Sequence, residues 1–318
     1  MTRPSFRHWL VITQIISLVI IAGLSFRLAR PGTPPYPYIA KRLFVQQPND
    51  VIINFTDLRA QIQQYVTAAP ENIGVYFEYL PTNVSVNVNG NSEFYRASLV
   101  KLPVIMRTYK YVEDGKLSLD DMLTVEQKQL NNEYGTLWKR GVGTQISVRD
   151  LIRLILTESD NTAFNVLYEK VNVQLGNDLP SGDTSADDIY DYLDIPREAD
   201  GITPMISPRN YTSILKSLYF SAYLSYKHSN DILTTMTLPH TENWLRSGVR
   251  SGIPVADKIG LYNADQENLH VYSDCGIVFY PERAYSLCVM VHSADNTKSI
   301  AHIQQISKMV FDFIDQRP

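Results

Sequence analysis

A serine and a lysine three residues apart form the most informative pattern in this 318-residue sequence, Ser98-Leu99-Val100-Lys101. On a helix, residues at i and i+3 lie on one face, so the lysine amine can reach the serine hydroxyl. An uncharged lysine could accept the serine proton and leave an alkoxide-like nucleophile. The spacing therefore predicts a catalyst that forms a covalent intermediate.

The serine–lysine spacing alone is weak evidence, because Ser213-Ile214-Leu215-Lys216 has it too. Most such matches are surface residues of a helix. We prefer Ser98 because its helix begins directly after a pair of predicted strands. Ser213 instead lies inside a well-capped amphipathic helix, where Lys216 is expected to face solvent.

Two later triplets turn this weak motif into a strong one: Ser159-Asp160-Asn161 and Lys258-Ile259-Gly260. Taken alone, the first reads as an ordinary loop that caps a helix, since Asp and Asn are favoured there. The second, taken alone, could belong to any edge strand. It is the order of all three motifs that predicts a single site.

Together the three motifs resemble the penicillin-interacting serine enzymes, in particular the class A β-lactamases and related D,D-peptidase-like proteins. The resemblance covers residues 57–318. It implies an α+β fold, an α/β sandwich plus an all-α domain, with a five-stranded antiparallel sheet flanked by helices. It also implies a β-lactam or a peptidoglycan stem peptide as substrate and no cofactor.

The family resemblance implies a role for each motif. Ser98 is the acylated nucleophile, Lys101 is its base or proton relay, and Ser159 passes a proton toward the leaving nitrogen. Asn161 would hydrogen-bond the amide side chain of the substrate. Lys258 would place a positive charge near the substrate carboxylate and favour a neutral Lys101 by repulsion.

The strand that carries Lys258 is also expected to bind substrate, through Gly260 and Leu261. The backbone N–H groups of Ser98 and Leu261 would form an oxyanion hole. Arg250 either adds positive charge for the substrate carboxylate or is a structural surface arginine.

Two departures from the family pattern affect the expected activity. Ile259 stands where the family has Thr or Ser, so a hydroxyl that would bind the substrate carboxylate is missing. The glutamate that activates the deacylating water, with an asparagine four residues on, has no match in residues 185–198. Most acids there are expected to be solvated, with Glu198 as the remaining candidate. We therefore expect stable acylation or slow hydrolysis.

Composition excludes several other classes of function. The net charge of −4 offers no basic surface for nucleic acid. The six histidines lack the spacing of a metal site, so no metal is expected. Cys275 and Cys288 are placed on neighbouring strands of one hairpin, where we favour two packed thiols over a disulfide.

An apolar run near the amino terminus predicts that residues 1–30 are a membrane anchor or signal. The 17 residues of 10–26 carry no charge, a length near the lower limit for crossing a bilayer. No small-x-small cleavage pattern is evident, which favours an uncleaved anchor. Basic residues after the run favour a cytoplasmic location for the remainder. The chemistry instead predicts a single-pass protein of the bacterial cytoplasmic membrane, with an extracytoplasmic catalytic domain.

The remaining chain divides into a proline-rich linker, 31–50, and a catalytic domain, 51–318. Five segments have strand character, at residues 73–79, 84–88, 255–260, 269–279 and 285–292. They predict an antiparallel sheet into which a helical block is inserted. The sheet part is expected to comprise 51–97 and 245–318, and the helical part 98–244.

Two functions remain besides β-lactam hydrolysis by a Ser98 acyl-enzyme. One is a D,D-carboxypeptidase-like penicillin-binding protein. The other is a non-catalytic cell-wall sensor or binding domain on the same fold. The intact motifs argue against the binding domain, because a binder does not need a matched nucleophile and base, whereas Ile259 argues for it.

Overall fold

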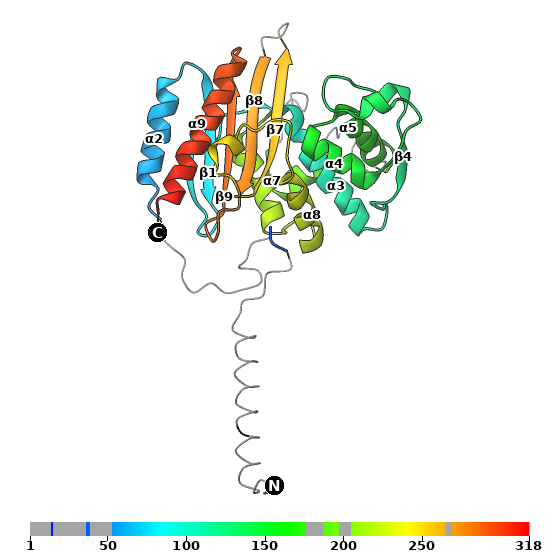
Figure 1. The fold of residues 1–318 in the computed structure, drawn as a ribbon, viewed down its shortest axis with the longest axis horizontal. Helices are drawn as coiled ribbons and strands as arrows, with labels where there is room; N and C mark the ends of the chain where they lie inside the picture. Colours follow the sequence, from blue (N-terminus) through cyan, green and yellow to red (C-terminus); the bar gives the residue numbers. More distant parts are fainter. Residues whose placement is uncertain are drawn as a thin grey trace, which may run out of the picture.

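Five antiparallel strands form the central sheet, in the order β2-β1-β9-β8-β7 (Figure 1). Their bounds are β1 Asn72–Tyr79, β2 Val84–Val88, β7 Val255–Ala264, β8 Leu269–Val278 and β9 Tyr285–His292. The computed structural model describes residues 53–175, 187–196, 205–264 and 269–317, together with 14 and 36–38. The predicted α+β fold with a five-stranded antiparallel sheet is confirmed.

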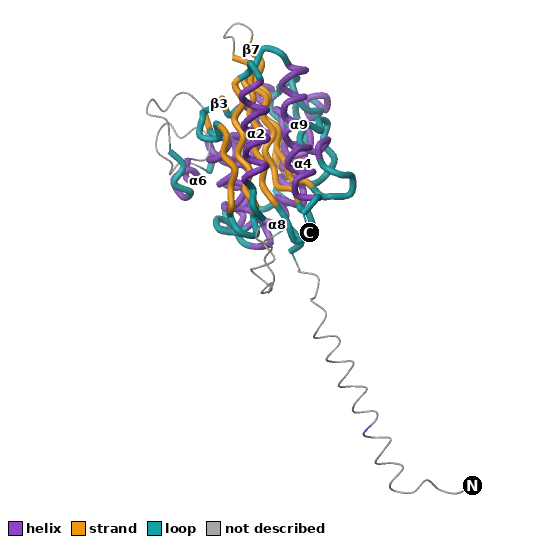
Figure 2. The backbone as a smooth tube through the Cα atoms, turned by 90° about the vertical axis from the view of Figure 1, so that its left-hand side faces the viewer, coloured by secondary structure: helices purple, strands orange, loops and turns teal. Residues whose placement is uncertain are grey.

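Helices cover both faces of the sheet. Helices α2 (Thr56–Ala68) and α9 (Asn296–Asp315) lie side by side on one face, and α7 (Pro208–Tyr219) packs on the other (Figures 1 and 2). Alternate residues of β9 therefore enter different cores. Val289 packs with the α2 and α9 side chains, while Met290 packs with those of α7. Burial on both faces explains why β9 reads as one apolar run.

The chain between β2 and β7 supplies the helical part of the molecule. Its main helices are α3 (Lys101–Glu113), α4 (Val148–Glu158), α5 (Asn161–Tyr168), α6 (Asp187–Tyr192), α7 and α8 (Tyr226–Met236). Short turns and helices connect them: η2 (Ala97–Val100), η3 (Gln127–Gln129), η4 (Leu137–Arg140) and η5 (Glu169–Gln174), with η6 (Arg246–Gly248) before β7. Two small sheets pair β3 (Phe94–Tyr95) with β6 (Met205–Ile206) and β4 (Met122–Thr124) with β5 (Gln145–Ser147).

The predicted serine caps are present at two of these helices. Ser147 Oγ accepts a hydrogen bond from the Asp150 N–H at the start of α4, at 3.1 Å. Ser207 caps α7 in the same way, with proline as the first helical residue. Helix α3 begins at Lys101, so Ser98 lies in the preceding turn η2 rather than in the helix itself.

The cysteines correct one sequence prediction, because Cys275 and Cys288 form a disulfide. They are direct partners on β8 and β9, with Cα atoms 3.9 Å apart. Directly opposed residues of antiparallel strands bring their side chains together on one face. The two thiols expected to pack separately are thereby within bonding distance.

The predicted membrane location is a second correction. Residues 10–26 lie outside the described residues except for Gln14. Within the described part of the chain, no helix has both the length and the apolar character needed to cross a membrane. This finding contradicts the single-pass membrane assignment, which had relied on a run at the short end of the spanning range.

Part of the predicted linker contacts the folded domain. Residues 36–38 are described, and the Tyr38 N–H donates to Asn230 Oδ1 of α8 at 3.2 Å. The Tyr38 ring meets Phe279, just beyond β8, with centroids 4.7 Å apart. The boundaries proposed for the linker and for the two parts of the catalytic domain remain predictions.

Removal of the disulfide should lower the free energy of unfolding. The two cysteines are 13 residues apart in sequence, a separation for which a disulfide contributes about 3 kcal/mol through the unfolded chain. Urea unfolding of a Cys275→Ala, Cys288→Ala double variant should show this loss. Reductant should lower the wild-type midpoint and leave that of the double variant unchanged. Equal wild-type midpoints with and without reductant would contradict the assignment.

Candidate active site

Ser98 and Lys101 lie at the junction of η2 and α3. Ala97, directly before the serine, has a φ of +46°, a left-handed conformation that costs energy for a residue with a side chain. This turn leaves Ser98 partly exposed, on the wall of two cavities. Among the described residues, the Ser98 hydroxyl has no hydrogen-bond partner.

The Lys101 amine lies at the centre of the polar contacts. Its Nζ is 2.6 Å from the Ser159 carbonyl oxygen, 2.6 Å from Asn161 Oδ1 and 3.1 Å from Ser159 Oγ. The side chain is only 3% exposed, and its amine also lies 5.7 Å from the centre of the Phe164 ring. The first two sequence motifs therefore meet at one nitrogen atom.

The pKa of Lys101 is held well below its ordinary value, chiefly because burial penalises the ammonium form. Repulsion from Lys258 lowers this pKa further, and the Asp160 carboxylate opposes both effects. A neutral amine has two N–H donors and one lone pair. Because the two carbonyl oxygens can only accept, they take the N–H donors and leave the lone pair for a proton.

The loop 159–161 places two of the contacting groups. Ser159 ends α4 in a left-handed conformation, with a φ of +51°, which turns the chain back toward Lys101. Asp160 then caps α5 by accepting from the Ala163 N–H at 2.8 Å. Its other oxygen accepts the N–H groups of Thr136 at 2.6 Å and Leu137 at 2.7 Å. One buried carboxylate thus fastens the loop to two other segments.

Lys258 approaches the same serine from the sheet. Its Nζ lies 3.1 Å from Ser159 Oγ and 2.8 Å from the Ile259 carbonyl oxygen. Burial lowers the pKa of Lys258 to about 8, against the attraction of Asp274 and Asp257. The Ser159 hydroxyl therefore bridges two buried lysines, which links all three sequence motifs.

Gly260 allows β7 to approach η2, the turn that contains Ser98. A Cβ atom at this position would lie 2.8 Å from Leu99 Cγ and 3.3 Å from the Arg96 carbonyl oxygen. The structure therefore gives Gly260 a packing contact beside Ser98. Leu261, the next residue, lines both cavities with Ser98, as an oxyanion partner would require.

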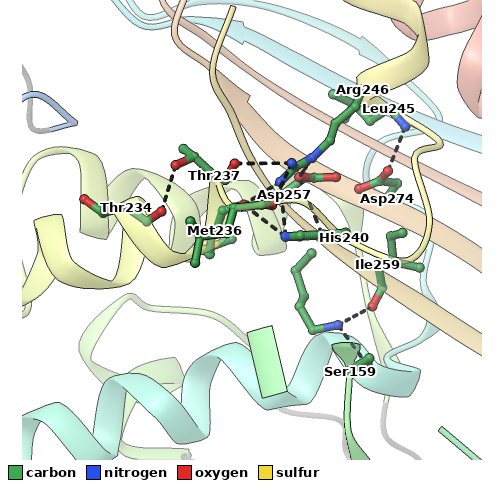
Figure 3. Close-up of polar contacts among 12 residues, drawn as sticks. Ser159, Thr234, Met236, Thr237, His240, Leu245, Arg246, Asp257, Ile259 and Asp274 are labelled. Carbon is green, nitrogen blue, oxygen red and sulfur yellow. Dashed lines mark hydrogen bonds and ion pairs between the residues drawn. The ribbon is translucent and has the colours of Figure 1, made fainter. Parts of the chain in front are cut away.

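A charged cluster of Arg246 with the buried Asp257 and Asp274 was not identified from the sequence (Figure 3). Asp257 Oδ1 accepts from Arg246 Nε at 2.6 Å, and Asp274 Oδ2 accepts from the Leu245 N–H at 2.8 Å. Burial raises the pKa of both carboxyl groups. It also contributes most to the lowering of the His240 pKa to about 3, with Arg246 and Lys258 adding repulsion. One signal in the sequence could have indicated this cluster: Asp257 and Lys258 are adjacent charged residues inside an otherwise largely apolar strand.

The two cavities that Ser98 lines differ in size. The larger, about 680 Å³, is lined by Lys101 and Asn161 together with other polar side chains and five aromatic rings. Its rings come from Tyr95, Tyr134, Phe164, Tyr168 and Tyr262. The smaller, about 30 Å³, lies beside Ser159 and Lys258.

Two residues considered from the sequence lie elsewhere. Arg250 pairs with Asp315 at the end of α9, at 3.0 Å, and is not among the residues that line either cavity. It therefore matches the surface alternative rather than the substrate-binding one. Lys216, expected to face solvent, forms an ion pair with the buried carboxylate of Glu78 instead.

The structure describes only residues 187–196 of the acid-rich segment 185–198, and Glu198 lies outside the described part. Asp188 is held from two sides: it accepts from Arg107 Nε at 2.9 Å and from the Tyr223 hydroxyl at 2.9 Å. Arg107 is 1% exposed, so its guanidinium requires a carboxylate beside it. Asp188 therefore has a structural partner, unlike the solvated acid expected from the sequence.

The family can now be stated, because a model of the β-lactamase enzyme family matches residues 57–314. The chain belongs to the β-lactamase enzyme family. It is therefore a serine hydrolase by family. The matched region includes η2, the loop 159–161 and β7.

Individual members of the β-lactamase family are distant in sequence. A β-lactamase from Phocaeicola vulgatus is 27% identical, over 81% of this chain and 85% of the relative. β-Lactamase CARB-3 from Pseudomonas aeruginosa is 24% identical, over 88% and 94%. The structure of PBP-A superposes with a TM-score of 0.70 at 26% identity, covering 82% of this chain and 97% of PBP-A.

Replacing Asp160 with Asn should destabilise the domain. The amide would present an N–H group to backbone donors that now share a buried carboxylate, which costs about 2–3 kcal/mol. Urea unfolding should show this loss. The exposed Asp150→Asn variant of α4 is the control and should change stability by less than about 1 kcal/mol. Equal effects of the two substitutions would contradict the fastening role of Asp160.

Proposed function

We propose that this protein is a penicillin-interacting serine acyl-enzyme that is acylated on Ser98 and releases its product slowly. The observation that carries the proposal is the buried Lys101 amine. It lies within 3.1 Å of Ser159 Oγ and has a lowered pKa, beside a cavity that Ser98 lines. A neutral amine in this position is suited to accept the proton of a serine hydroxyl.

Acylation would proceed by proton transfer along the groups that converge here. Lys101 takes the Ser98 proton as Oγ attacks the β-lactam carbonyl carbon. As the C–N bond breaks, a proton reaches the leaving nitrogen through Ser159, whose hydroxyl touches both lysines. The N–H groups of Ser98 and Leu261 would stabilise the oxyanion, and Asn161 would hold the acyl side chain.

The acid-rich segment supports slow release of the acyl group from Ser98. Hydrolysis of the acyl-enzyme needs a base that activates water, and residues 185–198 lack the family spacing. Asp188 in the described part of that segment is bound to Arg107 and Tyr223. The acyl-enzyme complex of a PBP-A mutant with penicillin G supports penicillin as an acyl donor here.

The same acylation chemistry supports a second candidate, a D,D-peptidase that acts on D-Ala-D-Ala peptides. The likeness to PBP-A and the occupied Asp188 favour it over rapid β-lactam hydrolysis. A chromogenic cephalosporin separates the two. Rapid colour development indicates a β-lactamase with fast deacylation, and labelling without colour indicates a penicillin-binding peptidase.

Ser98→Ala should abolish covalent labelling by benzylpenicillin. Intact-mass analysis of residues 31–318 should show one penicillin adduct on the wild-type protein and none on this variant. Ser213→Ala is the matched control, because it removes the serine of the second serine–lysine match and should retain the adduct. Absence of any wild-type adduct, with unchanged ligand affinity in Ser98→Ala, would instead indicate a non-catalytic binding domain.

The acylation rate should depend on pH as a bell. It should rise as Lys101 loses its proton, and fall above about pH 8 as Lys258, with its pKa lowered to about 8, becomes neutral. Stopped-flow labelling with a fluorescent penicillin measures both limbs. In Lys258→Arg the guanidinium stays charged, so the alkaline limb should move to higher pH. An unmoved limb would exclude Lys258 as its source; exposed Lys308→Arg is the control.

A further inference from the structure

The two cavities beside Ser98 face opposite parts of a substrate under the proposed function. Asn161 lines the wide cavity, so that side receives the acyl donor. Ser159 and Lys258 line the narrow cavity, so that side receives the leaving group. At about 30 Å³ the narrow cavity holds little more than a water molecule. A leaving group would therefore lie at the mouth of this cavity, next to the side chains that line it.

The narrow cavity carries two carboxylates. Glu158 and Glu242 both line it, and each is held by a neutral donor. Glu158 Oε2 accepts from the Thr136 hydroxyl at 2.6 Å, and Glu242 Oε2 accepts from the Trp244 indole N–H at 3.3 Å. Within the described ranges, neither has a cationic side chain at ion-pair distance.

Positive charge on this side is limited. Lys258 Nζ already contacts Ser159 Oγ and the Ile259 carbonyl oxygen. Arg246 is bound to Asp257 and to the backbone carbonyl of Leu238, at 2.6 and 2.8 Å. His240, which also lines the cavity, is neutral because burial and its two cationic neighbours lower its pKa to about 3. Ile259 contributes no hydroxyl.

We propose that Glu158 and Glu242 determine leaving-group specificity, so that the enzyme prefers acyl donors whose leaving group is neutral or cationic. A substrate carboxylate next to the scissile bond would be repelled by the two glutamates. The attraction of Lys258 would be shared with Ser159 Oγ and the Ile259 carbonyl oxygen, which its amine already contacts. The proposal rests on Ser98 acylation and concerns only which acyl donors are fast. Penicillins remain substrates, but their carboxylate slows the step.

Three thioesters of N-benzoyl-D-alanine test this proposal, since they differ only in the leaving thiol. The thiols are mercaptoacetate, which is anionic, mercaptoethanol, which is neutral, and thiocholine, which is cationic. In each reaction Ser98 Oγ bonds to the acyl carbon, the C–S bond breaks, and the serine proton passes through Lys101 and Ser159 to the departing thiolate. Release of thiol gives kcat/KM for each ester.

The expected order of kcat/KM is thiocholine, mercaptoethanol, then mercaptoacetate. The ratio of thiocholine to mercaptoacetate should fall about tenfold in Glu242→Gln and further in the Glu158→Gln, Glu242→Gln double variant. Glu126→Gln, which removes the same charge from an exposed residue, is the control and should leave the ratio unchanged. High salt should lower the ratio of thiocholine to mercaptoacetate in the wild-type enzyme, because salt screens the repulsion. This test does not depend on whether a variant folds.

The outcomes separate this proposal from the function on which it rests. A wild-type preference for the mercaptoacetate ester, or a ratio that neither salt nor Glu242→Gln changes, would overturn the specificity proposal while Ser98 acylation stands. Failure of all three esters and of benzylpenicillin to acylate Ser98 would overturn the proposed function itself.

Discussion

The site depends on the removal of one amine from water. Lys101 is buried among two carbonyl oxygens and a hydroxyl, and burial contributes more to its lowered pKa than Lys258 does. The resemblance to penicillin-interacting enzymes implied repulsion between the lysines as the cause. Repulsion is present, but it adds to an effect that the helical part produces by enclosing the side chain. The charged form of a buried amine is unfavourable unless neighbouring groups compensate for the lost hydration.

The segments that surround Lys101 are held by buried polar contacts. Asp160 ties the loop 159–161 to the residues before η4, and without such ties the left-handed turn at Ser159 would be unfavourable. On the sheet side, Asp257 and Asp274 lie near Lys258 and oppose the burial that lowers its pKa. Their attraction limits the fall in the pKa of Lys258, which is about 8, whereas Asp160 opposes the fall in the pKa of Lys101. The difference between two buried lysines is set by their neighbours.

The proposed slow turnover and the proposed specificity have a common origin in how acids are placed. Asp188, in the segment where the family has a water-activating glutamate, pairs with the buried guanidinium of Arg107. Glu158 and Glu242, in contrast, lack cationic partners in the described structure and line the smaller cavity together with Ser98, the proposed nucleophile. The acid in the segment that would activate water in other family members is therefore paired with a cation. The two acids on the side where a substrate carboxylate would approach are not.

The sequence alone predicted Ser98 as the nucleophile, with Lys101 and the two later motifs, because spacing and order suffice to recognise the family pattern. It also determined the strands and helix caps, since periodicity and capping act over a few residues. The cysteine pairing, the positions of Arg250 and Lys216, and the cluster of Arg246, Asp257 and Asp274 were decided only by tertiary structure. Each depends on which segments meet across the sheet, and local sequence carries no record of the distance between them. The lowered pKa values have the same cause, because burial is a property of the assembled fold.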